Sequence, residues 1–289
     1  MPIRFLAILV CLVLLPAQVL SVESDRLRIE APASVSEGDP FLVRVSTDRP
    51  LSAVEISWLG ERAHLPLQES NGTHDGEIIL GTEAGQDEPG VRWIGARASG
   101  NGSSLVHKRR IKIRNKDFPR QHLSLPEESV TLSTSQYKRY KEDKRAIGKA
   151  LGRTSEERAW SRPLRWPARG EITSTYGLDR ILNGQPRSPH RGIDLALPMG
   201  TPIRSTEAGR VVLTGEFFFE GKAVFIDHGR GLISMYFHLS TISAREGKRV
   251  ERGEVIGKSG ESGRSSGPHL HFGLSALNRL VNPLPLLGE

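Results

Sequence analysis

The chain has 289 residues but a single cysteine, Cys11, which lies inside an apolar run near the N-terminus. One cysteine cannot form an internal disulfide, and a zinc site built from cysteine thiolates is excluded. Val10, just before it, is not small, so a lipid-modified cysteine is not expected either. Any metal ligand must therefore come from histidine, aspartate or glutamate.

A hydrophobic run long enough to cross a membrane is also missing. The apolar stretch Phe5 to Pro16 is shorter than the about 20 residues that a spanning helix needs. It follows a short basic start, Met1 to Arg4, and precedes a region that resembles a cleavage site, Gln18 to Ser21. This layout is typical of a secretory signal peptide over residues 1–21. We expect an exported protein, periplasmic or extracellular, with no stable membrane span after cleavage; an uncleaved anchor is the alternative.

Acidic residues are fewer than basic ones, 33 against 40, which leaves a net charge of +7. A basic chain favours anionic surroundings such as nucleic acid, anionic lipid or an acidic cell-wall polymer. The sequence has no basic stripe interleaved with aromatics and no nucleic-acid motif, so nucleic acid is not an expected partner. Hydrophobic residues make up 37% and charged residues 25%, as in packed, soluble proteins of one or two domains.

Residues 22–117 predict a small β-sandwich, because short runs alternate apolar and polar residues and turn-forming residues separate them. The alternating apolar residues are Phe41, Val43 and Val45, then Val54, Ile56 and Trp58, then Val91 and Trp93, then Ile111 and Ile113. The histidines of this region, His64, His74 and His107, are scattered, and we expect no chemistry from them.

Residues 118–165 predict a helical linker. Ser133 to Leu151 carries apolar residues among many charges, which favours a solvated helix between two domains. An acidic partner for its charged face is the alternative. Residues 166–286 then return to glycine-rich β runs and form a second β domain, so the whole chain is expected to be mainly β.

Three segments of this second domain carry the chemically interesting side chains. They are Ser188 to Asp194, Met235 to Ser240 and Gly267 to Phe272. Residues two apart share a face of a strand, so His269 and His271 oppose Leu270 and Phe272. By the same rule, Ser234, Tyr236 and His238 should oppose the apolar Ile233, Met235, Phe237 and Leu239. Each segment is expected to send its polar groups to one side.

This donor set suits catalytic zinc, which takes three protein ligands and leaves a fourth position open. The candidates are His190, Asp194, His238, His269 and His271. Three could bind the metal, and two would remain to move protons and stabilise developing charge. Spacing alone does not assign these roles. For any single histidine, a hydrogen-bonded core position is the alternative.

The segments resemble the M23 family of zinc metallopeptidases, the lysostaphin and LytM type. The family signatures His-x-x-x-Asp, a histidine in a His-Leu-Ser context, and His-x-His occur here in that order. Further similarity lies in the glycine-rich stretch Ile256 to Gly267, in Pro202-Ile203, in Asp227-His228-Gly229 and in Asn282-Pro283. The resemblance covers about residues 166–286 and implies an antiparallel β catalytic domain of the LytM, duplicated-hybrid-motif type. Gly273 departs from it, since many relatives have glutamate there.

The resemblance implies a role for each residue. His190, Asp194 and His271 match the ligands of one Zn²⁺. His269 matches the general base, and His238 matches the histidine that stabilises the transition state or shares the base role. His228 matches no ligand and is expected to be structural.

The expected function is hydrolysis of peptide bonds in peptidoglycan stems or cross-links by a secreted zinc endopeptidase. A D-alanyl–diaminopimelate cross-link or a glycine bridge is the candidate bond. One alternative is a non-catalytic, LytM-like regulator of other cell-wall hydrolases, although such regulators lack ligands that are all present here. Another is a binding module with structural zinc, which would need a fourth protein ligand. A regulatory protein partner that exposes the cleft is a further expectation.

Overall fold

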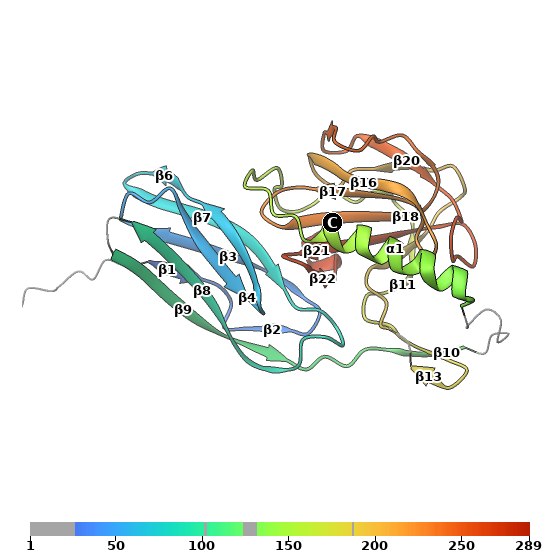
Figure 1. Cartoon of the computed structure of the whole chain (residues 1–289), viewed down its shortest axis with the longest axis horizontal. Coiled ribbons are helices and arrows are strands. Elements are labelled where there is room, and N and C mark those ends of the chain that lie inside the picture. Colours follow the sequence, from blue (N-terminus) through green and yellow to red (C-terminus); the bar gives the residue numbers. More distant parts are fainter. Residues whose placement is uncertain (1–26, 101–102, 124–131, 187) are drawn as a thin grey trace, which may run out of the picture.

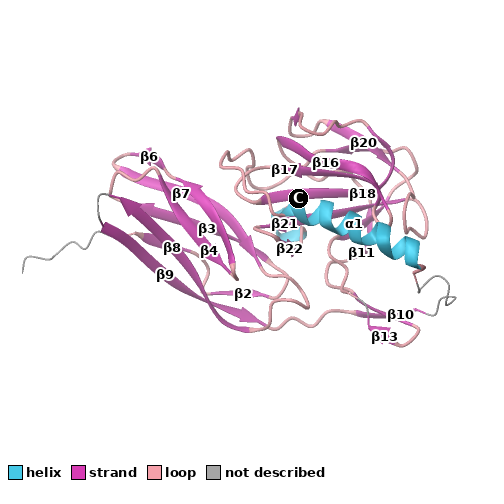
Figure 2. Ribbon diagram, viewed as in Figure 1, coloured by secondary structure: helices cyan, strands magenta, loops and turns pink. Residues whose placement is uncertain are grey.

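The computed structural model describes residues 27–100, 103–123, 132–186 and 188–289. The predicted signal peptide, residues 1–21, lies outside this part of the chain. Within it, none of the helices is both long and apolar enough to cross a membrane. Strands dominate, and the one long helix is α1 (Figures 1 and 2). The chain is therefore mainly β, as the sequence predicts.

The N-terminal region is a sandwich of two sheets (Figure 1). One sheet has the order β1-β3-β7-β6, with β1 Arg28–Glu30, β3 Pro40–Thr47, β7 Thr73–Gly81 and β6 Gln68–Ser70. The other has the order β2-β9-β8-β4-β5, with β2 Ser34–Ser36, β9 Ser103–Arg114, β8 Gly90–Gly100, β4 Ala53–Trp58 and β5 Glu61–Pro66. Val43, Val45 and Ile56 are completely buried between the sheets.

The strand predicted at Val91 and Trp93 is present as β8, but these two side chains do not face the core. They are 48% and 56% exposed, whereas Ile94 and Ala96 of the same strand are buried. The sequence offers apolar residues on both faces of β8, and the sheet opposite decides which face is covered. The pairing of Trp93 with Arg110 on β9 places the indole on the outer, basic face.

The C-terminal region is built on a ten-stranded sheet, whose main path is β11-β14-β21-β18-β17-β16-β19. The strands on this path are β11 Glu171–Ser174, β14 Ile193–Ala196, β21 His269–Ala276, β18 Leu232–Ile242, β17 Gly221–Asp227, β16 Gly209–Phe217 and β19 Arg249–Val250. Off the path lie β15 Pro202–Arg204, β20 Val255–Ser259 and β22 Arg279–Val281, and the 3₁₀ helix η2 Leu284–Leu286 follows. All strand pairs of this sheet are antiparallel.

Helix α1 spans Thr134–Leu151 and begins after Ser133, which forms a capping box with Gln136. The helix packs against β16 of the C-terminal sheet. Its buried residue, Ala150, belongs to a cluster with Phe217. The predicted helix is therefore present, but it is not solvated on every side, because its apolar stripe lies on the second β domain.

A small three-stranded sheet was not foreseen. In it β12 Asp179–Leu182 lies between β10 Arg120–Leu123 and β13 Gln185–Pro186. The parallel pairing of β10 with β12 joins two segments that are far apart in the sequence (Figure 1). Nothing in either segment alone signals this long-range pairing, because each strand is only 4 residues long.

Buried charges connect the sandwich to the second domain. Glu83 and Asp87 come from the loop after β7, and they form ion pairs with Arg191 and Arg279 respectively. Burial raises the pKa of Asp87, and the Arg279 guanidinium opposes that rise. A buried carboxylate is costly without its partner, so these pairs favour one fixed placement of the two domains. Arg191 directly follows His190, so this contact reaches the candidate metal centre.

Candidate metal centre

His190 lies on an extended segment just before β14, and backbone pairing holds this segment in place. Its amide donates to Leu178 O at 3.0 Å, and its carbonyl accepts from Gly177 N at 2.7 Å. Its Nδ1 lies 2.9 Å from Thr175 O. Because a carbonyl only accepts, Nδ1 carries the proton, and the lone pair of the neutral ring is on Nε2.

Asp194 and His271 are directly opposite each other in the register of β14 and β21. On β21, Leu270 and Phe272 are completely buried, whereas His271 points to the other face of the strand. The period-two prediction for this segment is therefore confirmed. Gly192 allows close packing, since a Cβ there would lie 2.6 Å from His271 Nε2.

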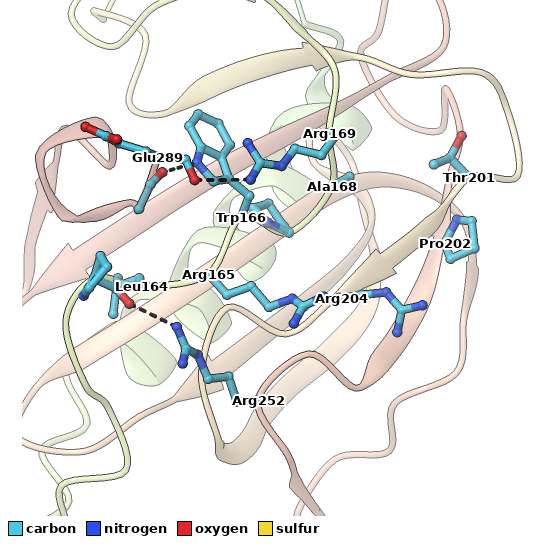
Figure 3. A pocket seen from close by; sticks show the side chains of 13 residues that line it. Leu164, Arg165, Trp166, Ala168, Arg169, Thr201, Pro202, Arg204, Arg252 and Glu289 are labelled. Carbon is cyan, nitrogen blue, oxygen red and sulfur yellow. Dashed lines mark hydrogen bonds between the residues drawn. The ribbon is translucent and has the colours of Figure 1, made fainter.

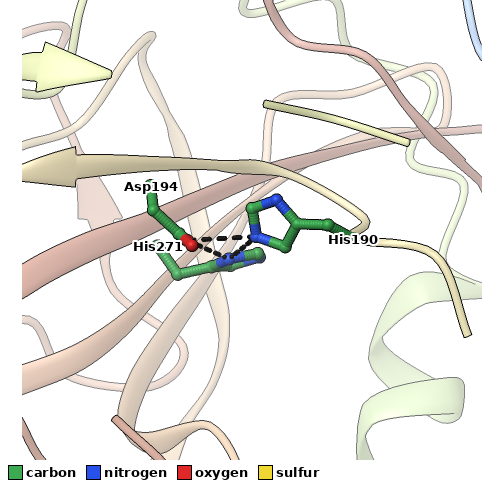
Figure 4. Close-up of side chains that lie close together, drawn as sticks. All are labelled: His190, Asp194 and His271. Atoms are coloured by element: carbon green, nitrogen blue, oxygen red, sulfur yellow. Dashed lines mark hydrogen bonds and ion pairs between the residues drawn. The ribbon is translucent and has the colours of Figure 1, made fainter. Parts of the chain in front are cut away.

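The three side chains converge on one point (Figure 4). Asp194 Oδ1 lies 3.0 Å from His190 Nε2 and 2.9 Å from His271 Nδ1. The two ring nitrogens are 2.9 Å apart. Tetrahedral ligands at 2.0–2.1 Å from zinc would be about 3.3 Å apart, so a small widening of this cluster accommodates the ion. Two imidazoles and one carboxylate are also the ligand types that zinc prefers, so the residues fit the metal.

The site is sheltered from water, and this sets its electrostatics. His190 and Asp194 are 7% and 8% exposed. Burial alone would raise the pKa of Asp194, but hydrogen bonds with His190 and His271 hold it well below its usual range. Burial lowers the pKa of His271. Near neutral pH the cluster therefore presents a carboxylate and an uncharged His271 imidazole, which are the protonation states that bind a cation.

His269 lies beside this cluster on the same strand as His271. Its Nδ1 is 2.8 Å from Gly267 O, so it donates to this carbonyl. Its Nε2 lies 3.9 Å from Asp194 Oδ1 and faces the cluster. The backbone thus fixes a tautomer in which Nε2 can accept a proton.

His238 also reaches the cluster, but the predicted alternation of faces holds in its segment only as far as Phe237, and the prediction for His238 and Leu239 was wrong. Phe237 pairs with His271 and stacks on its ring, with 5.0 Å between ring centroids, so Phe237 shares the metal face. Ser234 and Tyr236 instead face the apolar core, where their hydroxyls are 3.0 Å apart.

A bulge explains how His238 still reaches the metal face. The register of β18 with β17 shifts in this part of the strand, and His238 has φ 63°. A bulge with a left-handed residue re-aims a side chain, at a cost of about 1–2 kcal/mol. The His238 amide donates to Glu220 O and its Nδ1 donates to Ser262 O. Its ring centroid lies 4.7 Å from that of His269, and burial lowers its pKa to about 4.

The structure brings all five sequence-predicted residues together at one face of the sheet. Sequence reasoning missed the groups that orient them, which are chiefly the backbone carbonyls of Thr175, Ser262 and Gly267. A carbonyl occurs at every position, so no residue pattern could have revealed these three. His228 lies elsewhere. It is buried between Ala208 O and Ser234 Oγ, in agreement with its expected structural role.

Comparison with known proteins finds a family match over the same segments. The family model of "Peptidase family M23" matches residues 188–283, which contain all five side chains. A solved structure described as a peptidase M23 of Pseudomonas aeruginosa is 30% identical, with a TM-score of 0.67 over 87% of this chain and 96% of that one. This chain belongs to peptidase family M23.

Two curated relatives carry names that describe an activity. "Peptidoglycan DD-endopeptidase ShyA" of Vibrio cholerae is 43% identical over 97 residues, and "DD-carboxypeptidase/endopeptidase Mpg" of Neisseria meningitidis is 45% identical over 95 residues. These matches cover 34% and 33% of this M23 chain. The chain spans less than a quarter of the length of either relative, 23% and 22% respectively.

Proposed function

We propose that this M23 protein is an exported zinc endopeptidase that hydrolyses peptide bonds in peptidoglycan. The convergence of His190, Asp194 and His271, with His238 and His269 beside them, carries the proposal. The names of the curated relatives favour a cross-link between D-amino acids as the bond that is cut. The predicted signal peptide and the basic net charge suit an anionic cell-wall setting.

In this proposal His190, Asp194 and His271 hold one zinc ion. When bound, zinc would supply Lewis-acid polarisation of the scissile carbonyl and make water a better nucleophile near neutral pH. Ser174 Oγ and Thr175 O lie at 3.2 and 2.9 Å from His190 Nδ1 and keep the Nε2 of that imidazole pointed at Asp194 and His271, where it would bind the metal.

His269 is the proposed general base. Its Nδ1 is held by Gly267 O, so the lone pair on Nε2 faces the reaction and takes the proton of the attacking water. His238 is neutral near pH 7, and its Nδ1 proton is held by Ser262 O, so its Nε2 also accepts a proton. The imidazole that has taken the proton of the water can then donate it to the leaving amine or to the developing oxyanion.

The domain boundaries are part of the same proposal. The sandwich (22–117) and the linker (118–165) act as supports for the peptidase domain (166–286), through the contacts of Glu83 with Arg191 and of α1 with β16. A regulatory protein that binds the sandwich or α1 could act on the metal centre through these contacts.

The test uses the protein that starts at residue 22. Zinc content is measured by inductively coupled plasma mass spectrometry. Cleavage of purified peptidoglycan is measured by mass spectrometry of the released muropeptides. His271→Ala should lose both zinc and cleavage, whereas His269→Ala should keep zinc and lose cleavage. His64→Ala, a histidine on the sandwich, is the matched control and should keep both. Zinc-loaded protein that cleaves no muropeptide would overturn the proposal in favour of a non-catalytic regulator.

A further inference from the structure

A hollow separate from the metal centre lies in the C-terminal domain. It has a volume of about 750 Å³, within the size range of small-molecule sites. Residues 163–169, parts of 201–204, Arg252 and residues 288–289 line it (Figure 3). None of these belongs to the metal centre or to the segments that orient its side chains. Occupancy of this hollow can therefore be measured separately from metal binding.

Four arginines surround the hollow (Figure 3). They are Arg165, Arg169, Arg204 and Arg252, and the only acidic residue in the lining is Glu289. Arg252 Nε pairs with Glu207 at 3.0 Å. In the described part of the chain, no carboxylate forms an ion pair with Arg165 or Arg204. The hollow therefore has a local excess of positive charge.

Backbone contacts hold two of these guanidinium groups, and only Arg252 also pairs with a carboxylate, that of Glu207. Arg204 Nη1 donates to Gly253 O at 2.9 Å, and Arg252 Nη2 donates to Pro163 O at 3.0 Å. Arg165 lies against Gly253, where a Cβ would be 3.2 Å from its Nη1. Gly253 has φ +81°, so its left-handed backbone also favours glycine. Backbone carbonyls thus order Arg204 and Arg252, Arg165 packs against Gly253, and further N–H groups of these side chains are left for a ligand.

We propose that this hollow, the arginine pocket, binds a multiply charged phosphate. Guanidinium groups donate paired N–H groups to phosphate oxygens. A carboxylate has two oxygens, which one arginine satisfies, whereas a phosphate offers more oxygens to several arginines from different directions. The volume exceeds that of a single phosphate, so the pocket accommodates a diphosphate or a stretch of phosphate-bearing polymer. Trp166 lines the same space and supplies an apolar wall beside the anion.

The test is isothermal titration calorimetry. Inorganic pyrophosphate is titrated, at constant ionic strength, into the zinc-loaded protein that starts at residue 22. The double variant Arg165→Gln, Arg204→Gln should bind at least about tenfold more weakly, because two charge-assisted contacts are lost. The control, Lys144→Gln with Arg145→Gln, makes the same charge change on the exposed side of α1 and should stay within about twofold of the parent. Thermal unfolding checks that both variants fold.

Pyrophosphate could also bind the zinc, so His271→Ala is titrated in parallel. Binding that survives in His271→Ala but not in Arg165→Gln, Arg204→Gln supports the arginine pocket. Binding that is lost only in His271→Ala overturns it, as does an equal loss in the α1 control, which would indicate general charge attraction.

Co-sedimentation with an insoluble poly(glycerol phosphate) then distinguishes the two sources of the group. Retention of the parent but not of Arg165→Gln, Arg204→Gln identifies a polymer-borne phosphate. Binding of pyrophosphate without retention on the polymer identifies a free one. The absence of saturable binding to either probe overturns the proposal.

Discussion

The two β regions place their polar side chains in opposite ways. On the outer face of the sandwich, Arg110 and Lys112 point into water beside the exposed Trp93. In the ten-stranded sheet, one face buries Phe272, and the other holds half-buried or buried imidazoles and Asp194. Charged side chains in water contribute little to stability, because water screens their interactions. Ionisable groups that are sheltered from water have shifted pKa values and can bind a metal. Similar alternation therefore yields an exposed basic face in one region and a sheltered cluster of ionisable groups in the other.

The sharpest contrast is expected between two aspartates. Asp194→Ala removes the carboxylate of the candidate metal cluster, so zinc should be lost and muropeptide release should fall below detection. Asp75→Ala on the sandwich removes a half-buried partner of Arg44, 3.9 Å away, and should leave both unchanged. Zinc content and muropeptide release are measured on both. Full zinc occupancy in Asp194→Ala would contradict the ligand assignment.

Core truncations should separate stability from metal binding. Phe272→Ala and Trp58→Ala each empty a completely buried site, and each should lower the free energy of unfolding by about 3–5 kcal/mol. Of these two residues, Phe272 lies on the strand that carries His271 and His269, whereas Trp58 lies in the sandwich. Phe272→Ala should therefore also weaken zinc affinity, and Trp58→Ala should not. Denaturant unfolding and zinc titration with a competing chelator measure the two effects. Equal weakening in both variants would argue that the sandwich sets the site geometry as strongly as the sheet does.

His228 should make the C-terminal domain sensitive to acid. Burial lowers its pKa to about 4 from an ordinary 6.5, so the folded state binds its proton less readily than the unfolded chain. The resulting stability is fully present above pH 6.5 and is lost as the pH falls towards 4, by about 3 kcal/mol in total. His228→Gln should remove this part of the pH dependence. The free energy of unfolding of both proteins is measured at pH 7 and pH 4. An equal loss of stability between these two pH values in the parent and in His228→Gln would contradict the prediction.

The smallest effect is expected at the helix between the two regions. Ser133→Ala removes the hydroxyl that accepts from Gln136 N at 3.3 Å, which should cost about 1 kcal/mol. Helix α1 packs on β16 through one stripe only, so its first turn should exchange amide hydrogens faster while the sheets stay protected. Hydrogen-exchange mass spectrometry measures this. Thr134→Ala, at the exposed first residue of the helix and not at the cap, is the control.

Much of the site followed from the sequence because strands have a fixed side-chain period. The placement of His269 and His271 opposite Leu270 and Phe272 needed only that period. The same rule holds in β18 as far as Phe237 and then fails, because a bulge at His238 turns its imidazole to the metal face. It also gave no information on which face of β8 is covered, because Val91 and Trp93 are as apolar as the residues that are buried.

The sequence by itself determined which chemical groups are present and much of their spacing. It supplied the histidines and Asp194, excluded cysteine ligands, and encoded the cap of α1 through Ser133 and Gln136. The tertiary structure alone decided which ring nitrogen carries the proton, because carbonyls of Thr175, Ser262 and Gly267 make that choice. It also gathered the arginines of the arginine pocket from separate segments. Backbone groups are alike at every residue, and distant segments carry no mark of their future neighbours, so only folding brings these contacts into existence.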